Sequence, residues 1–293
     1  MPPFVDYRSW DDDNSRWEGF PFRTGDVVVS TRSKSGTTWV QMICALLVFQ
    51  TPQLPAPLAE LSPWLDWRVV PLDDVLATLA AQRHRRIIKT HTPLDGLPLD
   101  RRATYVVVAR HPLDVALSLY HHGDNLDRRR IARLTGSAPP GPQGERPPVD
   151  VWLRRWIEWE GTPAEQLDSL PGVLWHLTDA WSRRAEPNVV LVHYDDLRED
   201  LGGEMHRLAG ELGFDVPQER WPALVEAAGF TSMRARADEL APDRRGVLLD
   251  RRRFFRQGTS GAGRAVLGDA GVAQYEARAR ELALPDLLAW LHR

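Results

Sequence analysis

Four short apolar runs mark where the chain is expected to form a sheet. They cover residues 27–30, 86–90, 104–109 and 189–193, and valine and isoleucine dominate them. Short apolar runs that are rich in β-branched residues and bounded by polar or glycine-containing loops are typical of buried strands. We therefore predict a buried strand at each of these four places.

Helices are predicted between and after these strands. Residues 39–49 are apolar nearly all round, as expected for a helix packed on a sheet, and Pro52 follows the run. Pro112 opens a second helix that continues through Tyr120, because the first helical position tolerates proline. An amphipathic helix is predicted near residues 199–212. Strands that alternate with helices predict an α/β fold, in which helices flank a doubly wound parallel sheet.

The chain is expected to form one domain over residues 1–293, because neither a dividing linker nor an internal repeat is visible. Two stretches are poor in residues that could be buried. Residues 123–149 combine three consecutive arginines with a Gly/Pro-rich run, and residues 251–263 are rich in arginine and glycine. Long loops within a compact domain are typically lids or disordered segments, so we predict that both stretches are mobile.

Composition narrows the class of protein. The chain has 293 residues, of which 43% are hydrophobic and 26% charged, which excludes intrinsic disorder of the whole. It has no apolar run long enough to span a membrane and no secretory signal. A formal net charge of −3 gives no support for a nucleic-acid partner. A single cysteine, Cys44, excludes intrachain disulfides and suits a reducing cytoplasm.

The basic residues are unusually biased. Of 37 lysines and arginines, only Lys34 and Lys89 are lysines. Lysine carries a compact ammonium on a flexible stem and can give up a proton, which arginine cannot do in a protein. Chance is the alternative, but both lysines lie inside motifs that indicate chemistry.

The first of these motifs joins the first strand to the first helix. Gly36 allows close backbone approach to a ligand, Thr37 and Thr38 add hydroxyls, and Lys34 adds a mobile cation. Free N–H groups and the helix dipole favour anions at such a position. Unlike the usual phosphate-binding loop, this one has its lysine before the glycine and lacks the first glycine, which argues against a Mg-nucleotide site. A plain loop is the alternative to an anion cradle.

The second motif follows the third strand. Arg110 stands at the carboxyl end of that strand, where open α/β sheets bind ligands, and Ser118 lies within the first two turns of the next helix. Guanidinium, hydroxyl and helix N-terminus together indicate a second phosphate site. The alternative is a helix start with a surface arginine. Two phosphate sites on one sheet fit a nucleotide that is phosphorylated at both ends of its ribose.

These motifs resemble those of the cytosolic-type sulfotransferases. Residues 34–39 are similar to the 5′-phosphosulfate loop of that family, and residues 110–118 to its 3′-phosphate motif. Residues 256–258, Arg-Gln-Gly, resemble its C-terminal Arg-Lys-Gly loop, and residues 89–91 match the strand end that carries its catalytic histidine. The resemblance spans about residues 20–275.

The resemblance implies a PAPS-dependent sulfotransferase (EC 2.8.2 type) with a P-loop-NTPase-like fold, which releases PAP and needs no metal. It implies that His91 takes a proton from the acceptor hydroxyl and that Lys34 and Lys89 neutralise charge on the leaving phosphate. The implied cofactor-binding residues are Lys34, Ser35, Gly36, Thr37, Thr38, Trp39, Arg110, Ser118, Tyr194, Thr231, Met233, Arg256, Gln257 and Gly258.

Two departures from the family pattern stand out. Arg32 and Ser33 replace the usual Tyr-Pro before the lysine. Gln257 replaces the lysine of the C-terminal loop, and residues 261–264 replace the usual Gly-Asp-Trp-Lys. These departures bear on the affinity for the cofactor and on the segment that covers it.

The expected acceptor is a hydroxyl of a small molecule, aromatic or lipophilic. The candidate lining residues are aromatic: Phe20, Phe22, Trp64, Trp67 and Tyr120. A role in the core is the alternative for these side chains. Two other functions compete with sulfation, namely a P-loop-type kinase that uses Mg-ATP and a nucleotide-binding protein without turnover. The sequence leaves the acceptor and the oligomeric state open.

Overall fold

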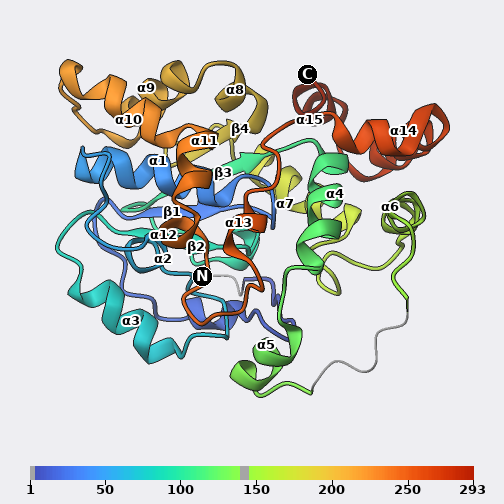
Figure 1. Ribbon diagram of the computed structural model, residues 1–293, viewed down its shortest axis with the longest axis horizontal. Helices are drawn as coiled ribbons and strands as arrows, with labels where there is room; N and C mark the ends of the chain where they lie inside the picture. The colour runs from blue at the N-terminus through green and yellow to red at the C-terminus, as the bar shows by residue number, and fades with distance from the viewer. Residues whose placement is uncertain (1–3, 139–144) are drawn as a thin grey trace.

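One four-stranded parallel sheet forms the centre of the molecule, in the strand order β2-β1-β3-β4 (Figure 1). The computed structural model describes residues 4–138 and 145–293. The strands are β1 (Val27–Ser30), β2 (Ile87–Thr90), β3 (Thr104–Ala109) and β4 (Val189–His193). The four predicted strands are confirmed to within one residue at each end.

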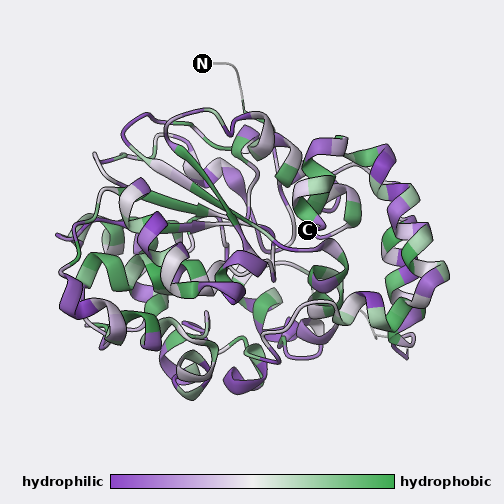
Figure 2. Ribbon diagram, turned by 90° about the horizontal axis from the view of Figure 1, so that it is seen from above, coloured by the Kyte–Doolittle hydropathy of each residue, from purple (hydrophilic) through white to green (hydrophobic). Residues whose placement is uncertain are grey.

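The two faces of the sheet build two separate apolar clusters. Val27 and Val29 belong to one cluster and Val28 to the other, because successive side chains of a strand point to opposite faces. In Figure 2 the strands are largely hydrophobic, and the helices around them alternate between hydrophobic and hydrophilic residues. Both faces are therefore covered, as predicted for a doubly wound sheet.

The helices divide between these two clusters. The cluster of Val27 and Val29 contains residues of α1 (Thr37–Phe49), α2 (Leu58–Leu61), α8 (Tyr194–Glu199), α9 (Leu201–Leu212), α10 (Trp221–Ala228), α11 (Phe230–Ala235) and α12 (Ala237–Leu240). The cluster of Val28 contains residues of α3 (Leu72–Ala81), α4 (Pro112–Gly123), α6 (Val149–Glu158), α7 (Leu170–Ser182), α14 (Ala262–Leu282) and α15 (Pro285–Leu291). Of the two short helices, α5 (Arg128–Thr135) contributes Ile131 to a third, small cluster with Trp67, and α13 (Arg251–Phe254) packs Phe254 against the cluster of Val27 and Val29.

Two sequence predictions need correction. The first helix begins at Thr37, two residues earlier than predicted, so both threonines of the loop motif lie in its first turn. Residues 123–149 are not one long loop, because α5 forms there with Asp127 as its N-cap and with Ile131 buried. Residues 139–144 lie outside the described chain. The predicted mobility of 123–149 and 251–263 stays a prediction.

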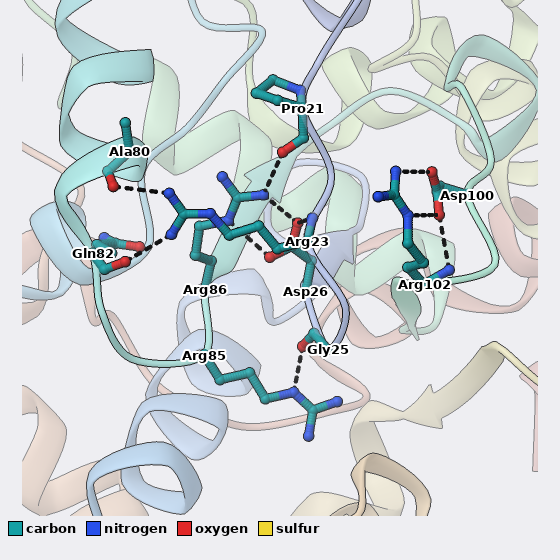
Figure 3. Close-up of polar contacts among 10 residues, drawn as sticks. All are labelled: Pro21, Arg23, Gly25, Asp26, Ala80, Gln82, Arg85, Arg86, Asp100 and Arg102. Atoms are coloured by element: carbon teal, nitrogen blue, oxygen red, sulfur yellow. Dashed lines mark hydrogen bonds and ion pairs between the residues drawn. The ribbon is translucent and has the colours of Figure 1, made fainter.

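A buried ion pair joins the amino ends of β1 and β2 (Figure 3). Asp26 and Arg86 precede these strands and are 1% and 2% exposed. The Arg86 Nε donates to Asp26 Oδ1 at 2.8 Å, and its Nη2 donates to the Pro21 carbonyl at 2.8 Å. The backbone N–H of Arg23 donates to the same carboxylate at 2.8 Å. Buried charges of this kind need such complete pairing, and here they order the edge of the sheet opposite the site.

At the carboxyl edge, four chemically distinctive residues follow the strands directly. Thr31 follows β1, His91 follows β2, Arg110 follows β3 and Tyr194 follows β4. Because all strands are parallel, these residues meet at one edge of the sheet.

Candidate active site

The N-terminus of α1 forms an anion cradle at the end of β1. Gly36 is its N-cap, with φ of 110°, and a Cβ at this position would lie 2.9 Å from Tyr194 Cδ2. Only glycine meets both constraints without strain. Thr37 and Thr38 occupy the first turn, which contains no acidic residue. In the described part of the chain no side chain caps this terminus, so its backbone N–H groups are available to an anion.

Four cations converge on this cradle. Lys34, Lys89, Arg110 and Arg256 line one cavity of about 610 Å³. None of the four pairs with a carboxylate among residues 4–138 and 145–293. Burial, reinforced by Arg110, Lys89 and Arg256, lowers the pKa of Lys34 to about 7. Such unneutralised charge in a cavity favours the binding of a multiply charged anion.

The two lysine ammonium groups are held over aromatic rings. Lys34 Nζ lies 3.8 Å from the ring centroid of Phe254, and Lys89 Nζ lies 3.6 Å from that of Trp64. Lys34 has φ of 67°, a left-handed conformation that is uncommon for lysine. Burial lowers the pKa of Lys89 to about 7, although Asp12 and Asp66 oppose this shift. Both lysines of the chain therefore face one cavity.

Arg110 lies at the cavity wall with Ser118 and the C-terminal segment, where the sequence predicts a second anion site. Its guanidinium lies 4.3 Å from the ring centroid of Tyr194 and donates to the carbonyls of Lys34 at 3.2 Å and Thr259 at 2.9 Å. Its buried Nε has no hydrogen-bond partner in the described structure. Ser118 lines the same cavity. The site therefore offers an unused donor and a hydroxyl, as a phosphate requires.

Asp114 holds the C-terminal segment over this second site. Its buried carboxylate accepts from the backbone N–H of Gly261 at 2.8 Å and of Gly263 at 2.9 Å. A Cβ on Gly263 would lie 2.3 Å from the carbonyl oxygen of Leu113, so α14 and α4 meet at a point that only glycine fits. This contact brings Arg256, Gln257 and Gly258 to the cavity wall.

His91 is arranged as a base. Its Nδ1 contacts the carbonyl oxygen of Thr31, and because a carbonyl only accepts, Nδ1 carries the proton and Nε2 is left with its lone pair. The imidazole meets the Trp64 ring edge-on, with centroids 4.5 Å apart. Burial, together with Lys89 and Arg32, lowers the pKa of His91 well below its usual value. The ring is therefore neutral at pH 7, as a proton acceptor must be.

Arg32 holds His91 in place. It donates to the backbone carbonyl of His91 and pairs with Asp168 at 2.6 Å. Its side chain is 4% exposed. The departure Arg32-Ser33 noted in the sequence thus supplies a buried support for His91.

Beside Lys89 and His91, the wall of the cavity holds carboxylates and indoles. Trp64 and Trp67 stack with centroids 4.6 Å apart, and Asp12 bridges to Trp67. Within the described residues, neither Asp12 Oδ1 nor Trp64 Nε1 has a hydrogen-bond partner, although both are buried. Burial, with Asp11 and Asp66 nearby, raises the pKa of Asp12 well above its usual value. Buried polar atoms without a hydrogen-bond partner are unfavourable, so we expect a bound ligand to offer polar groups to these two atoms.

Sequence reasoning missed this acidic wall. The run of three aspartates at residues 11–13 is the one signal that was present. Nothing local connects that run to Trp64 and Trp67, which lie more than 50 residues further along the chain.

Most predicted site residues line the cavity, and several do not. The lining includes Lys34, Gly36, Thr37, Thr38, Trp39, Trp64, Trp67, Lys89, His91, Arg110, Ser118, Tyr194, Met233, Arg256, Gln257 and Gly258. Thr231 is exposed outside the cavity, and Ser35 is buried beside it, with its N–H bonded to the Arg32 carbonyl at 3.2 Å. Contact of these two with the cofactor stays a prediction.

Three aromatic candidates for the acceptor pocket do not line it. Phe20 and Phe22 pack in the core against Trp17, with ring centroids 5.1 and 6.0 Å from it. They were predicted to line the cavity, but burial of apolar area against other aromatic rings decides their position. Tyr120 also lies outside the lining and donates to the Pro147 carbonyl at 3.0 Å.

No group of three or more histidine, cysteine, aspartate or glutamate residues suited to a metal ion occurs in the described ranges. Likewise, no described helix is both long and apolar enough to cross a membrane.

Comparison with known proteins gives a consistent family. The sulfotransferase domain model matches residues 24–280. A glycolipid sulfotransferase of Mycobacterium bovis is 41% identical over 311 residues, which cover 100% of this chain and 95% of that protein. The structure of retinol dehydratase with retinol and PAP has a TM-score of 0.70 at 22% identity, covering 95% of this chain and 86% of that one. Mouse sulfotransferase SULT7A1 with PAP also has a TM-score of 0.70, at 16% identity, covering 95% and 92%.

Proposed function

The chain belongs to the sulfotransferase domain family and is a PAPS-dependent sulfotransferase, and from that premise we propose that it sulfates a hydroxyl on the polar head of a lipid. PAPS supplies the sulfuryl group, whose bond to the bridging phosphate oxygen breaks as a bond to the acceptor oxygen forms, and PAP leaves. The sequence alone left two other functions open, a kinase that uses Mg-ATP and a nucleotide-binding protein without turnover. Membership of the sulfotransferase domain family supports neither of them.

The residues present fit such a donor. In our proposal the cradle of Gly36, Thr37 and Thr38 holds the 5′ end, and Lys34 lies where negative charge develops on the departing phosphate. Arg110 and Ser118 hold the 3′-phosphate, with residues 256–258 beside them. The convergence of four cations without carboxylate partners supports this assignment, since two anionic groups would neutralise them.

His91 is proposed as the general base. Its neutral imidazole has Nε2 free, and a proton that leaves the acceptor hydroxyl moves to that atom. Lys89 lies beside it, over Trp64, and we propose that it supports the transferring oxygens. Arg32 is a positioning residue, which acts through the backbone of His91.

The acceptor class is inferred from the cavity wall that contains Asp12, Trp64 and Trp67. Asp12 and Trp64 offer unpaired polar atoms, and the stacked indoles of Trp64 and Trp67 add apolar surface to the same cavity. A polyhydroxylated ring matches both features, because its hydroxyls can satisfy the polar atoms while its C–H face packs on an indole. The lining also has an apolar part at Leu126, Ile131, Val247 and Leu248, and the first three of these pack with Trp64 and Trp67.

A single observation carries the proposal: one cavity joins the cation cluster and His91 to a wall that is partly polar and partly apolar. The similarity to a glycolipid sulfotransferase over the whole chain supports it.

The test is a competition assay with labelled PAPS. Purified protein is offered a glycolipid, the free sugar of that glycolipid, a sterol and a simple phenol under the same conditions. We expect kcat/KM to be highest for the glycolipid, because only that acceptor occupies both the polar and the apolar wall. A higher kcat/KM for the phenol or the sterol would overturn the lipid-head assignment while leaving the sulfotransferase activity intact.

A Trp67→Ala variant checks the wall itself. It should raise KM for the glycolipid and leave KM for PAPS unchanged, since Trp67 stacks on Trp64 and is not one of the residues proposed to hold PAPS.

A further inference from the structure

Two arginine-rich segments lie side by side at the mouth of the cavity. The N–H of Asp127 donates to the Val247 carbonyl at 2.8 Å, and the N–H of Leu249 donates to the Asn125 carbonyl at 2.9 Å. The Nε of Arg130 donates to the Arg245 carbonyl at 2.6 Å. We call residues 124–135 and 243–256 together the basic rim. In Figure 1 its helix α5 stands at the lower edge of the molecule.

The basic rim concentrates positive charge. It contains ten arginines and four aspartates, whereas the whole chain has a formal net charge of −3. Seven of these arginines are exposed: Arg128, Arg129, Arg130, Arg133, Arg244, Arg252 and Arg253. Within the described ranges none of the seven forms an ion pair with a carboxylate.

The aspartates of the rim are engaged elsewhere. Asp127 and Asp250 cap α5 and α13, Asp243 pairs with Arg251 at 2.8 Å, and Asp124 pairs with Arg146. The exposed arginines are therefore left without local neutralisation.

Large apolar side chains are exposed among these charges. Leu249 is 62% exposed and Leu134 is 37% exposed. Trp10, 41% exposed, lies next to the end of α5, because Ser137 Oγ donates to its carbonyl at 2.8 Å. Arginine interleaved with exposed tryptophan and leucine is typical of a protein surface that inserts shallowly into a lipid interface.

The basic rim also borders the route into the site. Trp10, Arg128, Ile131 and Leu248 line the cavity, so a molecule that enters from this side passes along the basic rim. The same surface can therefore hold the protein on a bilayer and receive an acceptor from it.

We propose that the basic rim docks on the surface of an anionic lipid bilayer, so that the acceptor lipid enters the cavity directly from the membrane. The arginines contact lipid phosphates, and Trp10, Leu134 and Leu249 enter the interface. The proposal rests on the proposed lipid acceptor. Attachment is peripheral, since no described helix can span a membrane. Each arginine near an anionic surface should strengthen vesicle binding about fivefold.

Vesicle sedimentation tests the docking without any acceptor. The full chain is mixed with vesicles of phosphatidylcholine alone or with phosphatidylglycerol, at low and at raised salt. The test variant is R129Q/R133Q/R252Q, and none of these residues lines the cavity. The matched control is R83Q/R101Q/R155Q, which removes the same charge from exposed arginines outside the basic rim.

We expect binding to the anionic vesicles only, weakened by salt, and a loss of about a hundredfold in the test variant with little change in the control. Leu249→Ser should weaken vesicle binding without changing its dependence on salt. Equal binding to neutral vesicles, or an equal loss in both triple variants, would overturn the proposal. The proposal would also be overturned if a short RNA bound the wild-type protein more tightly than the anionic vesicles do, and if the test variant no longer bound that RNA. The basic rim would then be a nucleic-acid-binding surface.

Activity separates this inference from the proposed function. With the acceptor in neutral detergent micelles, the test variant should keep the wild-type kcat and KM. With the acceptor in anionic vesicles, its KM should rise about as much as its vesicle binding falls. If the wild-type protein sulfates no lipid even in detergent, the proposed function fails, whatever the vesicles show. If the wild-type protein sulfates the lipid in detergent but does not bind anionic vesicles, only the docking proposal fails.

Discussion

At the scale of single residues, the two lysines offer the sharpest test of the site. In one cavity Lys89 is buried and Lys34 is half-buried, whereas arginine stands at all the other lysine or arginine positions. If Lys34 follows a departing oxygen, Lys34→Arg should lower kcat about a hundredfold or more, because the larger, rigid guanidinium cannot bring a compact charge to that oxygen. Steady-state kinetics with labelled PAPS measure this. The control is the converse exchange at an exposed site, Arg129→Lys. If the Lys34→Arg enzyme keeps its activity, only the positive charge of Lys34 matters for catalysis.

The role of His91 predicts a dependence on the acidity of the acceptor. His91→Ala removes the proton acceptor, so kcat should fall most for weakly acidic hydroxyls and least for acidic phenols. The measurement is the slope of log kcat against acceptor pKa for a phenol series, in the parent and the variant. PAP affinity should be preserved, and His84→Ala, on a half-buried histidine outside the cavity, should leave the slope unchanged. An equal loss for all phenols would mean that His91 does not accept the proton.

At the scale of elements, Asp114 couples α4 to the segment that covers the cofactor site. Asp114→Asn weakens the bonds to the N–H groups of Gly261 and Gly263, so residues 256–263 should exchange amide hydrogen faster. PAP affinity should fall by roughly tenfold, the loss expected for a bond to a charged group. Hydrogen exchange by mass spectrometry and calorimetric titration with PAP measure the two effects. Asp269→Asn, exposed on α14, is the control, and unchanged exchange in the Asp114 variant would show that the tether is dispensable.

The same tether bears on the predicted mobility of the C-terminal segment. Residues 251–263 have few apolar side chains, but Thr259 and Ser260 are also bonded, to Arg110 and Asp195. Hydrogen bonds to other elements can order a segment whose low apolar content alone would predict mobility.

At the scale of the whole molecule, the two lysines of the cavity link stability to pH. Their pKa values are about 7 in the folded protein against 10.5 ordinarily. Between these values the unfolded chain binds more protons, so the free energy of unfolding should rise as pH increases from about 7 towards 10. Denaturant unfolding at a series of pH values measures this. Lys34→Gln should flatten the rise, whereas Arg129→Gln should not. A wild-type free energy that is level across this window would contradict the shifted pKa values.

Ligand binding should show the same linkage in the other direction. An anion next to Lys34 favours the charged ammonium, so PAP binding at pH 8 should take up protons. Titration calorimetry in two buffers of different ionisation enthalpy detects this uptake, and equal binding enthalpies in both would contradict it.

The sequence by itself determined the sheet and the helices that follow its first and third strands, whereas the anion-binding and catalytic roles of Lys34, Lys89, His91 and Arg110 stay predictions. β-Branched runs, glycine at a helix start and proline at a first helical position are local preferences, so the four strands, α1 and α4 followed from adjacent residues. Lys34 and Arg110 each belong to a short motif, in which the chemistry and the backbone that positions it are encoded together.

Only the tertiary structure decided what distant segments build together. Asp12 meets Trp67, Arg32 meets Asp168, and the segments around Asp127 and Val247 form the basic rim, although long stretches of chain separate the members of each pair. Phe20 and Phe22 show the same limit, because an aromatic run suits a core and a pocket equally well. Burial and proximity are properties of the packed chain as a whole, so no local pattern reports which polar atom is left unpaired or which charge faces solvent.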